Sequence, residues 1–496
     1  MINKYIQPNQ KYIWIPLAFI FKMLLSLYLL HSILLNSDQI TQTYAMVAGD
    51  TFSYFGAFDN LISKGEYDPF YRMPGVGFIY YLFRLLFSQQ ISYAFFVLFQ
   101  IVFDSIACYF LSKLAYQLTK SKLFFVITFI LSVSNSYFSV FNIWLLSESL
   151  CTSSLILSVY FFYQAILHKH QKEKSILLCG LFISWAIFCR PIYVPVLLFY
   201  FILFTFYLYK KNIKLLSRYL LIFISPFLLF DAIWVYAGYQ HSHKLFFLQH
   251  SSYQTSKENN KNTEAYMREP WKIALVQFVT SFGGDVVDWN PDAEITWFNA
   301  NIQFKQSKEC KLPGYAFTDY YNQDSLVLVK RNIEIIYDSL TKNPVRDSLK
   351  ATTEQSLTRF TQNFKKQKPF HYHVLSRLII LKKFLFHQPT YNLYSKPFNE
   401  LNKINKTIKL LFFLMYYIYL FGFFMSLIYL LINKKILLFL PVLLLVFFGI
   451  GIYPFLRFCE YRYIVPVIPF LLFLSSYTIY SILKLFRKTT WKRYPV

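Results

Sequence analysis

The first residue suited to chemistry is Asp50, which opens the polar stretch from Ala48 to Phe87, directly after the first long apolar segment. A carboxylate can remove the proton from an attacking hydroxyl group. Lys64 and Arg72 lie in the same stretch, and cationic side chains bind phosphate. This stretch therefore combines a possible proton acceptor with possible phosphate-binding cations. It predicts a site where a hydroxyl group is deprotonated near a phosphate, provided that the stretch faces water.

The composition indicates a polytopic membrane protein. Of 496 residues, 56% are hydrophobic, 21% aromatic and only 15% charged, and the long apolar runs are those of membrane-spanning segments. Lys and Arg number 50 against 25 Asp and Glu, a formal charge of +25. In a soluble protein such an excess would favour nucleic acid as a partner. Basic loops retained in the cytoplasm explain it better in a membrane protein, so we expect membrane lipids and no nucleic acid as partners.

Apolar segments of spanning length number ten, and the first should remain as a helix because its apolar run is too long for a signal peptide. The segments lie at residues 12–35, 92–115, 123–140, 145–167, 175–189, 192–209, 215–237, 409–432, 436–456 and 463–483. Two shorter amphipathic runs, Met73 to Phe87 and Val374 to Phe386, are expected to lie at the membrane surface.

The connections predict the orientation. Alternate short connections and the C-terminal tail are all basic, and basic connections stay in the cytoplasm. Both termini are then cytoplasmic, and loop 36–91 lies outside. The expected domains are a transmembrane catalytic module (1–237), an extracytoplasmic, mainly helical insert domain (238–407) and the last transmembrane helices (408–496). The predicted fold class is an all-α bundle of about ten transmembrane helices with outer-surface helices.

This orientation brings polar residues from distant parts of the chain to the outer face. They are Asp50, Lys64, Arg72, Glu148, Arg190, Arg457, Glu460, Tyr461 and Arg462. Each has a simpler explanation by itself. Glu148 could cap the start of a helix, Arg190 could belong to a plain turn before Pro191, and Arg457 and Arg462 could anchor the protein at the lipid surface.

Two ionisable residues, Lys22 and Asp104, lie near the middle of the first and second spans. Isolated charges at this depth are costly. Their matching depth predicts a buried ion pair between neighbouring helices, with a structural role in preference to a proton path.

Short motifs resemble the GT-C class of glycosyltransferases, in particular the bacterial branch similar to protein O-mannosyltransferases and lipid A aminoarabinose transferases. Their first outer loop resembles Gly49 to Tyr54 (GDTFSY) followed by Arg72 to Gly77 (RMPGVG). Weaker matches follow in the same order at Leu146 to Ser149, Cys189 to Pro191 and Glu460 to Pro469. The resemblance covers residues 1–237 and 408–496, and none of it lies in 238–407.

The resemblance implies an integral enzyme of the bacterial cytoplasmic membrane that transfers a sugar from a polyprenyl-phosphate donor to an extracytoplasmic glycolipid, cell-surface glycan or protein, with inversion. The family's catalytic base corresponds to Asp50. Many members carry a second acidic residue beside it, where this chain has Thr51, and we expect no tightly bound divalent metal or other cofactor. Glu148 would support the base by holding the acceptor or a cation. The candidates for binding the donor phosphate are Arg190, Arg457, Arg462, Arg72 and Lys64.

Two other functions remain open on the residues alone. A lipid-linked glycan flippase or transporter would need a polar path through the membrane, and a lipid-linked glycan polymerase would use the large outer loop. Aromatic residues of the surface helix could line a prenyl groove or simply pack it onto the bundle; these are Phe78, Tyr80, Tyr81, Phe83 and Phe87. Cys310 and Cys459 are the only two of the six cysteines predicted outside, where a disulfide could form.

Overall fold

The described residues of the computed structural model form helices joined by loops, with no β-strand among them, and the prediction of an all-α protein is confirmed. These residues are 7–36, 44–65, 67, 72–168, 171–208, 212–242, 245, 247–248, 270–284, 314–337, 342–386, 398–457 and 461–493. The chain forms two compact units. Unit 1 comprises residues 1–250, 388–448 and 465–496, and unit 2 comprises 251–387 and 449–464.

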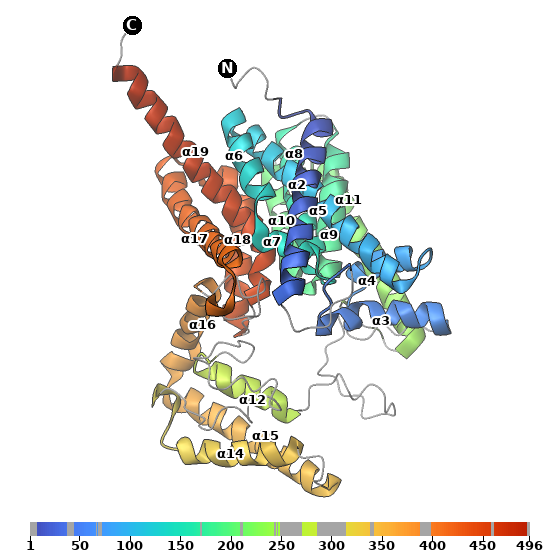
Figure 1. Cartoon of the computed structure of the whole chain (residues 1–496), viewed down its shortest axis with the longest axis vertical. Coiled ribbons are helices and arrows are strands. Elements are labelled where there is room, and N and C mark those ends of the chain that lie inside the picture. The colour runs from blue at the N-terminus through green and yellow to red at the C-terminus, as the bar shows by residue number, and fades with distance from the viewer. Residues whose placement is uncertain are drawn as a thin grey trace. The chain divides into compact units, whose positions relative to one another are not determined.

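Unit 1 contains most of the helices (Figure 1). They are α2 (Lys11–Asn36), α3 (Gly49–Lys64), α4 (Gly75–Arg84), α5 (Gln89–Thr119), α6 (Lys122–Val133), α7 (Ser136–Ser139), η1 (Val140–Asn142), α8 (Glu148–Leu167), α9 (Lys172–Cys189), η2 (Pro191–Tyr193), α10 (Val194–Leu208), α11 (Ile213–Ser242), η6 (Phe398–Glu400) and α17 (Lys403–Ile432). Along the sequence, α18 (Ile436–Leu456) and η7 (Tyr461–Val467) cross the boundary between the units, and α19 (Ile468–Arg493) returns to unit 1.

Eight of the described helices are long and apolar enough to cross a membrane, which supports a multi-pass membrane protein. They begin at Lys11, Gln89, Glu148, Pro191, Ile213, Lys403, Ile436 and Arg462.

The other two predicted spans differ in form. The segment 123–140 is broken, because α6 ends at Val133 and the Asn135 side chain accepts a hydrogen bond from Phe138 N (3.2 Å) at the start of the next turn. Residues 175–189 lie within α9, whose first turn is charged. The count of ten spans stays a prediction.

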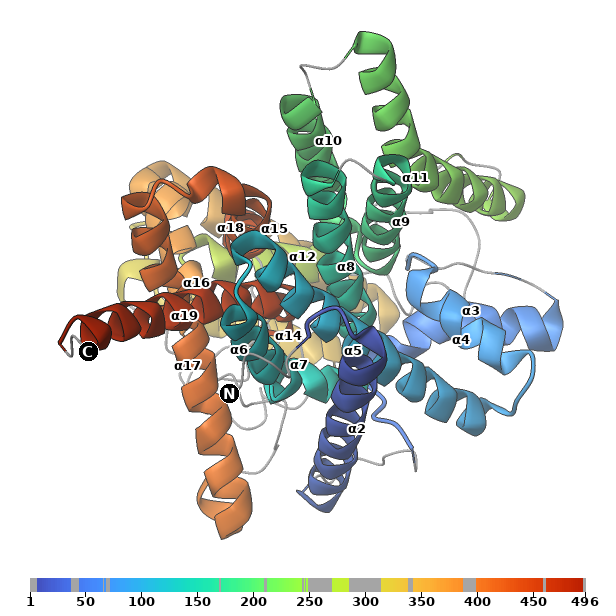
Figure 2. The ribbon, with the colours of Figure 1, turned by 90° about the horizontal axis from the view of Figure 1, so that it is seen from above.

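The surface helix predicted from Met73 to Phe87 is shorter, as α4, and packs against α3 beside it (Figure 2). Tyr80 is buried, stacks on Phe55 with ring centroids 4.2 Å apart and donates a hydrogen bond to Asp59 Oδ1 (2.7 Å). Phe83 packs on an aromatic ring of α5. For Tyr80 the groove-lining interpretation is therefore wrong, since its ring and hydroxyl are both used in packing.

The predicted buried pair of Lys22 and Asp104 is confirmed. Lys22 Nζ lies 3.0 Å from Asp104 Oδ2, and both side chains are fully buried. Lys22 also donates to Ser139 Oγ (2.7 Å), and Asn142 Nδ2 donates to Asp104 Oδ2 (2.7 Å). The pair thus ties α2 and α5 to the α7–η1 segment.

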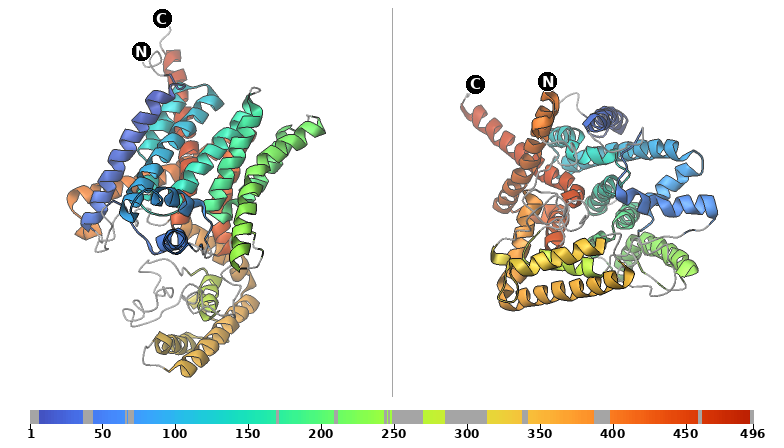
Figure 3. Two further views of the ribbon diagram at one scale, coloured as in Figure 1. Left: turned by 90° about the vertical axis from the view of Figure 1, so that its right-hand side faces the viewer. Right: turned by 60° about the horizontal axis from the view of Figure 1, so that its bottom comes forward.

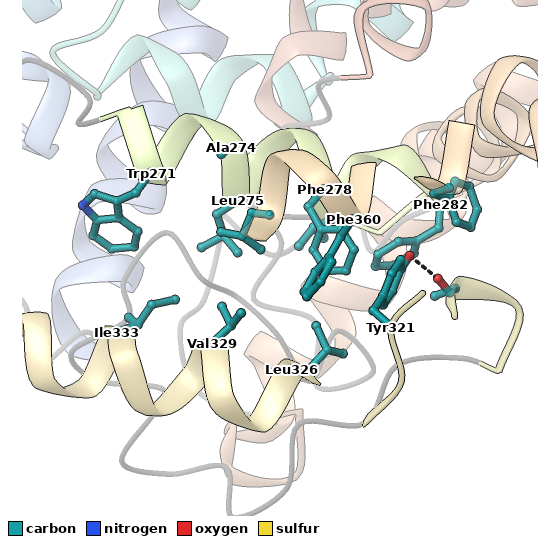
Figure 4. Close-up of a cluster of buried hydrophobic side chains, with 14 of the residues drawn as sticks. Trp271, Ala274, Leu275, Phe278, Phe282, Tyr321, Leu326, Val329, Ile333 and Phe360 are labelled. Atoms are coloured by element: carbon teal, nitrogen blue, oxygen red, sulfur yellow. Dashed lines mark hydrogen bonds between the residues drawn. The ribbon is translucent and has the colours of Figure 1, made fainter. Parts of the chain in front are cut away.

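Unit 2 has its own apolar core. Its described helices are α12 (Pro270–Ser281), η4 (Gly314–Ala316), α14 (Gln323–Tyr337), α15 (Asn343–Gln367), η5 (His371–Leu375) and α16 (Ser376–Leu385). Buried side chains of α12, α14 and α15 meet in one cluster around Phe278, and Tyr321 donates a hydrogen bond to Ala316 O beside it (Figure 4). An independent core of this kind indicates a folded domain.

We expect Lys22→Met to destabilise unit 1 strongly, by about 3–5 kcal/mol, because it leaves the Asp104 carboxylate buried without its cation. Lys22→Met combined with Asp104→Leu should recover much of the loss, since it removes both charges. Thermal unfolding of the purified protein in detergent measures the effect. A single variant as stable as the parent would contradict the structural role of the pair.

Candidate functional site

The helix that carries Asp50 is anchored to the segment that precedes α8. Met46 and Trp144 form a parallel bridge, in which Met46 N donates to Ile143 O (2.8 Å) and Leu145 N donates to Met46 O (3.0 Å). This backbone pairing fixes the entry to α3 beside residues 143–145. α3 itself lies crosswise to the bundle helices of unit 1 (Figures 1 and 3).

Thr51 has a structural role at the place where many GT-C enzymes carry a second acidic residue. Its hydroxyl is buried, accepts a hydrogen bond from Ala48 N (3.0 Å) and donates to Leu145 O (3.0 Å). The first contact caps α3, and the second holds the helix start to the segment before α8. A carboxylate could accept the first bond but could not donate the second.

Asp50 and Arg72 form an ion pair, with Arg72 Nη2 2.8 Å from Asp50 Oδ1. The other nitrogen atoms of the Arg72 guanidinium also form hydrogen bonds. Nε donates to Ser53 Oγ (3.1 Å), Nη1 donates to Tyr54 Oη (3.4 Å), and the guanidinium carbon lies 4.8 Å from the centre of the Tyr54 ring. Asp50 is 27% and Arg72 25% exposed, so this pair lies at an accessible edge of unit 1.

Glu148 and Arg190 form a second ion pair, between Oε1 and Nη2, that is almost completely buried. Glu148 is the first residue of α8, where the helix dipole favours a carboxylate. Arg190 directly follows α9, and its Nε donates to Ser147 Oγ (2.9 Å). The two helices pack along each other, which brings their ends together.

Tyr54 and Ser147 join the two ion pairs, because Tyr54 Oη donates a hydrogen bond to Ser147 Oγ (3.1 Å). The polar network therefore runs, in order of contact, through Asp50, Arg72, Tyr54, Ser147, Arg190 and Glu148. We call this set the Asp50–Glu148 network. It unites four of the site residues predicted from separate segments of the sequence.

The two linking hydroxyls were not among the predicted site residues, although they lie inside the motifs that carry the resemblance. Tyr54 closes the GDTFSY motif and Ser147 precedes Glu148 in LSES. Each of these hydroxyls accepts a hydrogen bond from an arginine and contacts the other hydroxyl. Because these partners come from other segments of the chain, the spacing of residues in the sequence does not reveal the contacts.

Further buried hydrogen bonds hold the segment between η1 and α8. Gln100 Nε2 donates to Asn142 O (3.1 Å) and to Trp144 O (3.0 Å). Ser149 Oγ donates to Asn142 Oδ1 (2.6 Å), and the amide of the same Asn142 reaches Asp104. The deep ion pair of α2 and α5 thus supports the segment that presents Ser147.

The other predicted site residues are not part of this network. Lys64 is exposed at the far end of α3, roughly 20 Å along the helix from Asp50 at 1.5 Å per residue. It therefore lies apart from the network, and its assignment to the donor phosphate stays a prediction. Arg457 and Arg462 belong to unit 2, and their joint action with Asp50 stays a prediction. Glu460, Cys310 and Cys459, and the proposed disulfide with them, lie outside the described residues.

The network can act on a phosphate and on a hydroxyl group. Arg72 and Arg190 supply positive charge with several N–H donors each, and Asp50 supplies an accessible carboxylate. Within the described ranges, no group of three or more His, Cys, Asp and Glu side chains could hold a metal ion.

Comparison with protein-family models, curated proteins and solved structures gives no match to this chain. The likeness to GT-C enzymes therefore rests on the short motifs themselves, and four of these motifs contribute to the Asp50–Glu148 network.

Gly75→Ala should disturb the network through packing. An added Cβ would lie 2.5 Å from Phe188 C and 2.6 Å from Phe188 O, two residues before Arg190, and α4 would have to move away from α9. We expect a loss of about 1–3 kcal/mol in the free energy of unfolding. Gly56→Ala in α3 is the matched control, because nothing lies within 4 Å of its Cβ position. It should keep or slightly raise the parental thermal stability, since Ala favours a helix more than Gly does. Equal melting temperatures for both variants would contradict the close approach.

Ser147→Ala should remove the link between the ion pairs. Tyr54 Oη and Arg190 Nε each lose a buried partner, so we expect a cost of about 1–3 kcal/mol. Combining it with Tyr54→Phe should cost less than the sum of the two single variants, with a coupling of about 0.5–2 kcal/mol. Unfolding measured for the two single variants and the double variant gives this coupling, and strictly additive effects would rule out the link.

Proposed function

We propose that this protein is an integral membrane glycosyltransferase of the GT-C type. It would move a sugar from a polyprenyl-phosphate donor to a glycolipid, cell-surface glycan or protein on the extracytoplasmic side of the bacterial cytoplasmic membrane, with inversion at the anomeric carbon. The observation that carries the proposal is the Asp50–Glu148 network. It gathers an accessible carboxylate and two guanidinium groups from three motifs of the resemblance.

Asp50 is the proposed general base. Its carboxylate takes the proton of the acceptor hydroxyl as that oxygen attacks the anomeric carbon of the sugar. The bond between this carbon and the phosphate oxygen breaks, and the polyprenyl phosphate leaves with the bonding electrons. Attack from the face opposite the leaving group inverts the configuration.

The cations of the network would stabilise the negative charge that grows on the leaving phosphate. Arg72 lies at the accessible edge with Asp50, so it would meet the phosphate directly. Arg190 is held behind it by Glu148 and Ser147. Glu148 then keeps Arg190 oriented, a role that supports the base without contact with the acceptor.

The burial of Glu148 supports function in preference to simple helix capping. A carboxylate at a helix start is satisfied by backbone N–H groups and the helix dipole. This one is fully buried and also receives a guanidinium from another helix, which costs desolvation of two charges. Ionisable residues inside membrane proteins are candidates for function. Unlike the deep pair of Lys22 and Asp104, this pair is joined to the accessible one through Ser147 and Tyr54.

Asp50→Asn should lower glycan transfer by at least about 100-fold, because an amide accepts no proton from the acceptor. Membranes from a deletion strain that carries the variant gene would be assayed by mass spectrometry of glycolipids and glycoproteins. Asp59→Asn is the matched control in the same helix. Asp59 pairs with Arg84 (3.4 Å) and Tyr80, away from the network, and its loss should leave the transfer rate near parental.

If Asp50→Asn transfers sugar at the parental rate, the proposed role of Asp50 as the general base is wrong. The charge-swapped variant, Asp50→Arg with Arg72→Asp, separates pairing from chemistry. It should restore the ion pair and be more stable to heat than Arg72→Asp alone, without restoring transfer. If the deletion strain instead retains single repeat units and lacks only long glycan chains, the protein is a lipid-linked glycan polymerase.

A further inference from the structure

Arg457 has an unusual environment at the end of α18. Its backbone adopts the left-handed conformation (φ 55°), which is uncommon for a residue with a side chain. Its guanidinium carbon lies 3.6 Å from the centre of the Tyr372 ring, and Nη2 donates to Tyr372 O. Nε is buried and has no hydrogen-bond acceptor among the described residues. The side chain is therefore held in place with donor capacity to spare.

A second arginine, Arg377 in α16, lies beside it. Its Nε donates to Phe455 O (3.2 Å), Nη1 donates to His373 O, and the guanidinium carbon lies 5.4 Å from the centre of the Phe455 ring. Phe455 precedes Arg457 by two residues, so both cations are fastened to the same short segment of unit 2. Arg377 was not among the predicted site residues.

Within the described residues, no carboxylate forms an ion pair with either of these two arginines. Every hydrogen-bond acceptor of Arg377 and Arg457 within the described ranges is a neutral backbone carbonyl, and neither forms an ion pair there. Burial, and to a lesser degree the nearby Arg377 guanidinium, lower the pKa of Arg457, while its contacts with Tyr372 raise it. Two repelling cations held together in this way are stabilised by an anion placed between them.

Apolar side chains are exposed on the same helical segment. Phe370 is 64%, Val374 40% and Leu378 53% exposed. They are spaced four residues apart and so form one stripe along η5 and α16, with Arg377 adjoining it in sequence. An anion that also carries a hydrocarbon chain would cover the stripe and the cations together.

We propose that Arg377 and Arg457 form a binding site in unit 2 for a phosphate group carried on a lipid. Guanidinium groups bind phosphate oxygens in bidentate fashion. Each of Arg377 and Arg457 has more N–H groups than it uses in hydrogen bonds to the described residues. The proposal does not depend on sugar transfer, because it concerns binding by residues outside the Asp50–Glu148 network. Polyprenyl phosphate and bilayer phospholipid share the required chemistry.

The test measures lipid binding to the purified full-length protein in a neutral detergent. The probes are polyprenyl monophosphate, phosphatidylglycerol, diacylglycerol and inorganic phosphate, and bound lipid is quantified by native mass spectrometry over a concentration series. Wild type should bind at least one phosphorylated lipid at least tenfold more tightly than diacylglycerol. Arg377→Gln should weaken that binding at least tenfold. Arg359→Gln removes an exposed cation from α15 of the same unit and should leave it unchanged.

The two phosphorylated lipids show whether the site binds polyprenyl phosphate or bilayer phospholipid. A loss confined to polyprenyl monophosphate identifies a site for the donor type of lipid, and an equal loss for phosphatidylglycerol identifies a general site for bilayer phospholipid. Unchanged affinity of Arg377→Gln for both lipids would overturn the proposal, as would a wild type that binds diacylglycerol equally well. If inorganic phosphate binds as tightly as the lipids, the assignment to a lipid is wrong.

Arg457→Gln adds a second variant, but it also removes the stack on Tyr372. Arg457→Lys serves as its partner, because it keeps the charge and should retain more binding than Arg457→Gln at an unchanged melting temperature. Transfer by wild type and Asp50→Asn is measured separately, so failure of this binding site and failure of the glycosyltransferase proposal give different results.

Discussion

Charges inside an apolar helix bundle are tolerated when an opposite charge and further hydrogen bonds meet them, and this requirement shapes unit 1. Glu148 is buried with Arg190, and Lys22 is buried with Asp104. Each pair joins segments far apart in the sequence, and each is completed by hydroxyl or amide groups. One partner without the other would be strongly destabilising. The pairs therefore favour the arrangement in which α2 lies beside α5 and the start of α8 lies beside the end of α9.

The two pairs are connected in their consequences. Asp104 holds Asn142, Asn142 holds Ser149, and the segment between them presents Ser147 to Tyr54 and Arg190. The deep ion pair thus supports the position of the Glu148–Arg190 pair through buried hydrogen bonds to Asn142 and Ser149 and the short stretch of chain from Ser147 to Ser149. In the proposed glycosyltransferase, such support would keep the carboxylate and the cations in a fixed geometry.

The two arginines of unit 2 have a different environment from the charged residues of unit 1. Arg377 and Arg457 are held by backbone carbonyls and aromatic rings, with no carboxylate partner among the described residues. A cation satisfied by neutral acceptors keeps its charge for a ligand, whereas one paired with a carboxylate must give up that partner first. Arginine therefore has two roles in this protein. It pairs with carboxylates in the Asp50–Glu148 network, and it would bind an external anion at the proposed lipid-phosphate site.

Composition and hydropathy determined the membrane class and the helical fold, because the bilayer demands long apolar helices whatever their sequence details. The matching depth of Lys22 and Asp104 was also enough to predict their pairing, since both must find a partner at that depth. Hydropathy gave the wrong form for the predicted span 123–140, in which α6 ends at Val133 and the Asn135 side chain accepts a hydrogen bond at the start of a new turn.

For the site, Asp50, Arg72, Glu148 and Arg190 could be named from residue type and position, but their pairing could not. Tyr54 and Ser147 became recognisable only once the bridge between Met46 and Trp144 had placed their segments together. Lys64 shows the converse. It is close to Asp50 in sequence but lies at the opposite end of α3, apart from the network. Sequence determined which residues could do chemistry, and tertiary structure alone decided which of them meet, because hydrogen bonds and ion pairs depend on distances between segments that no local pattern encodes.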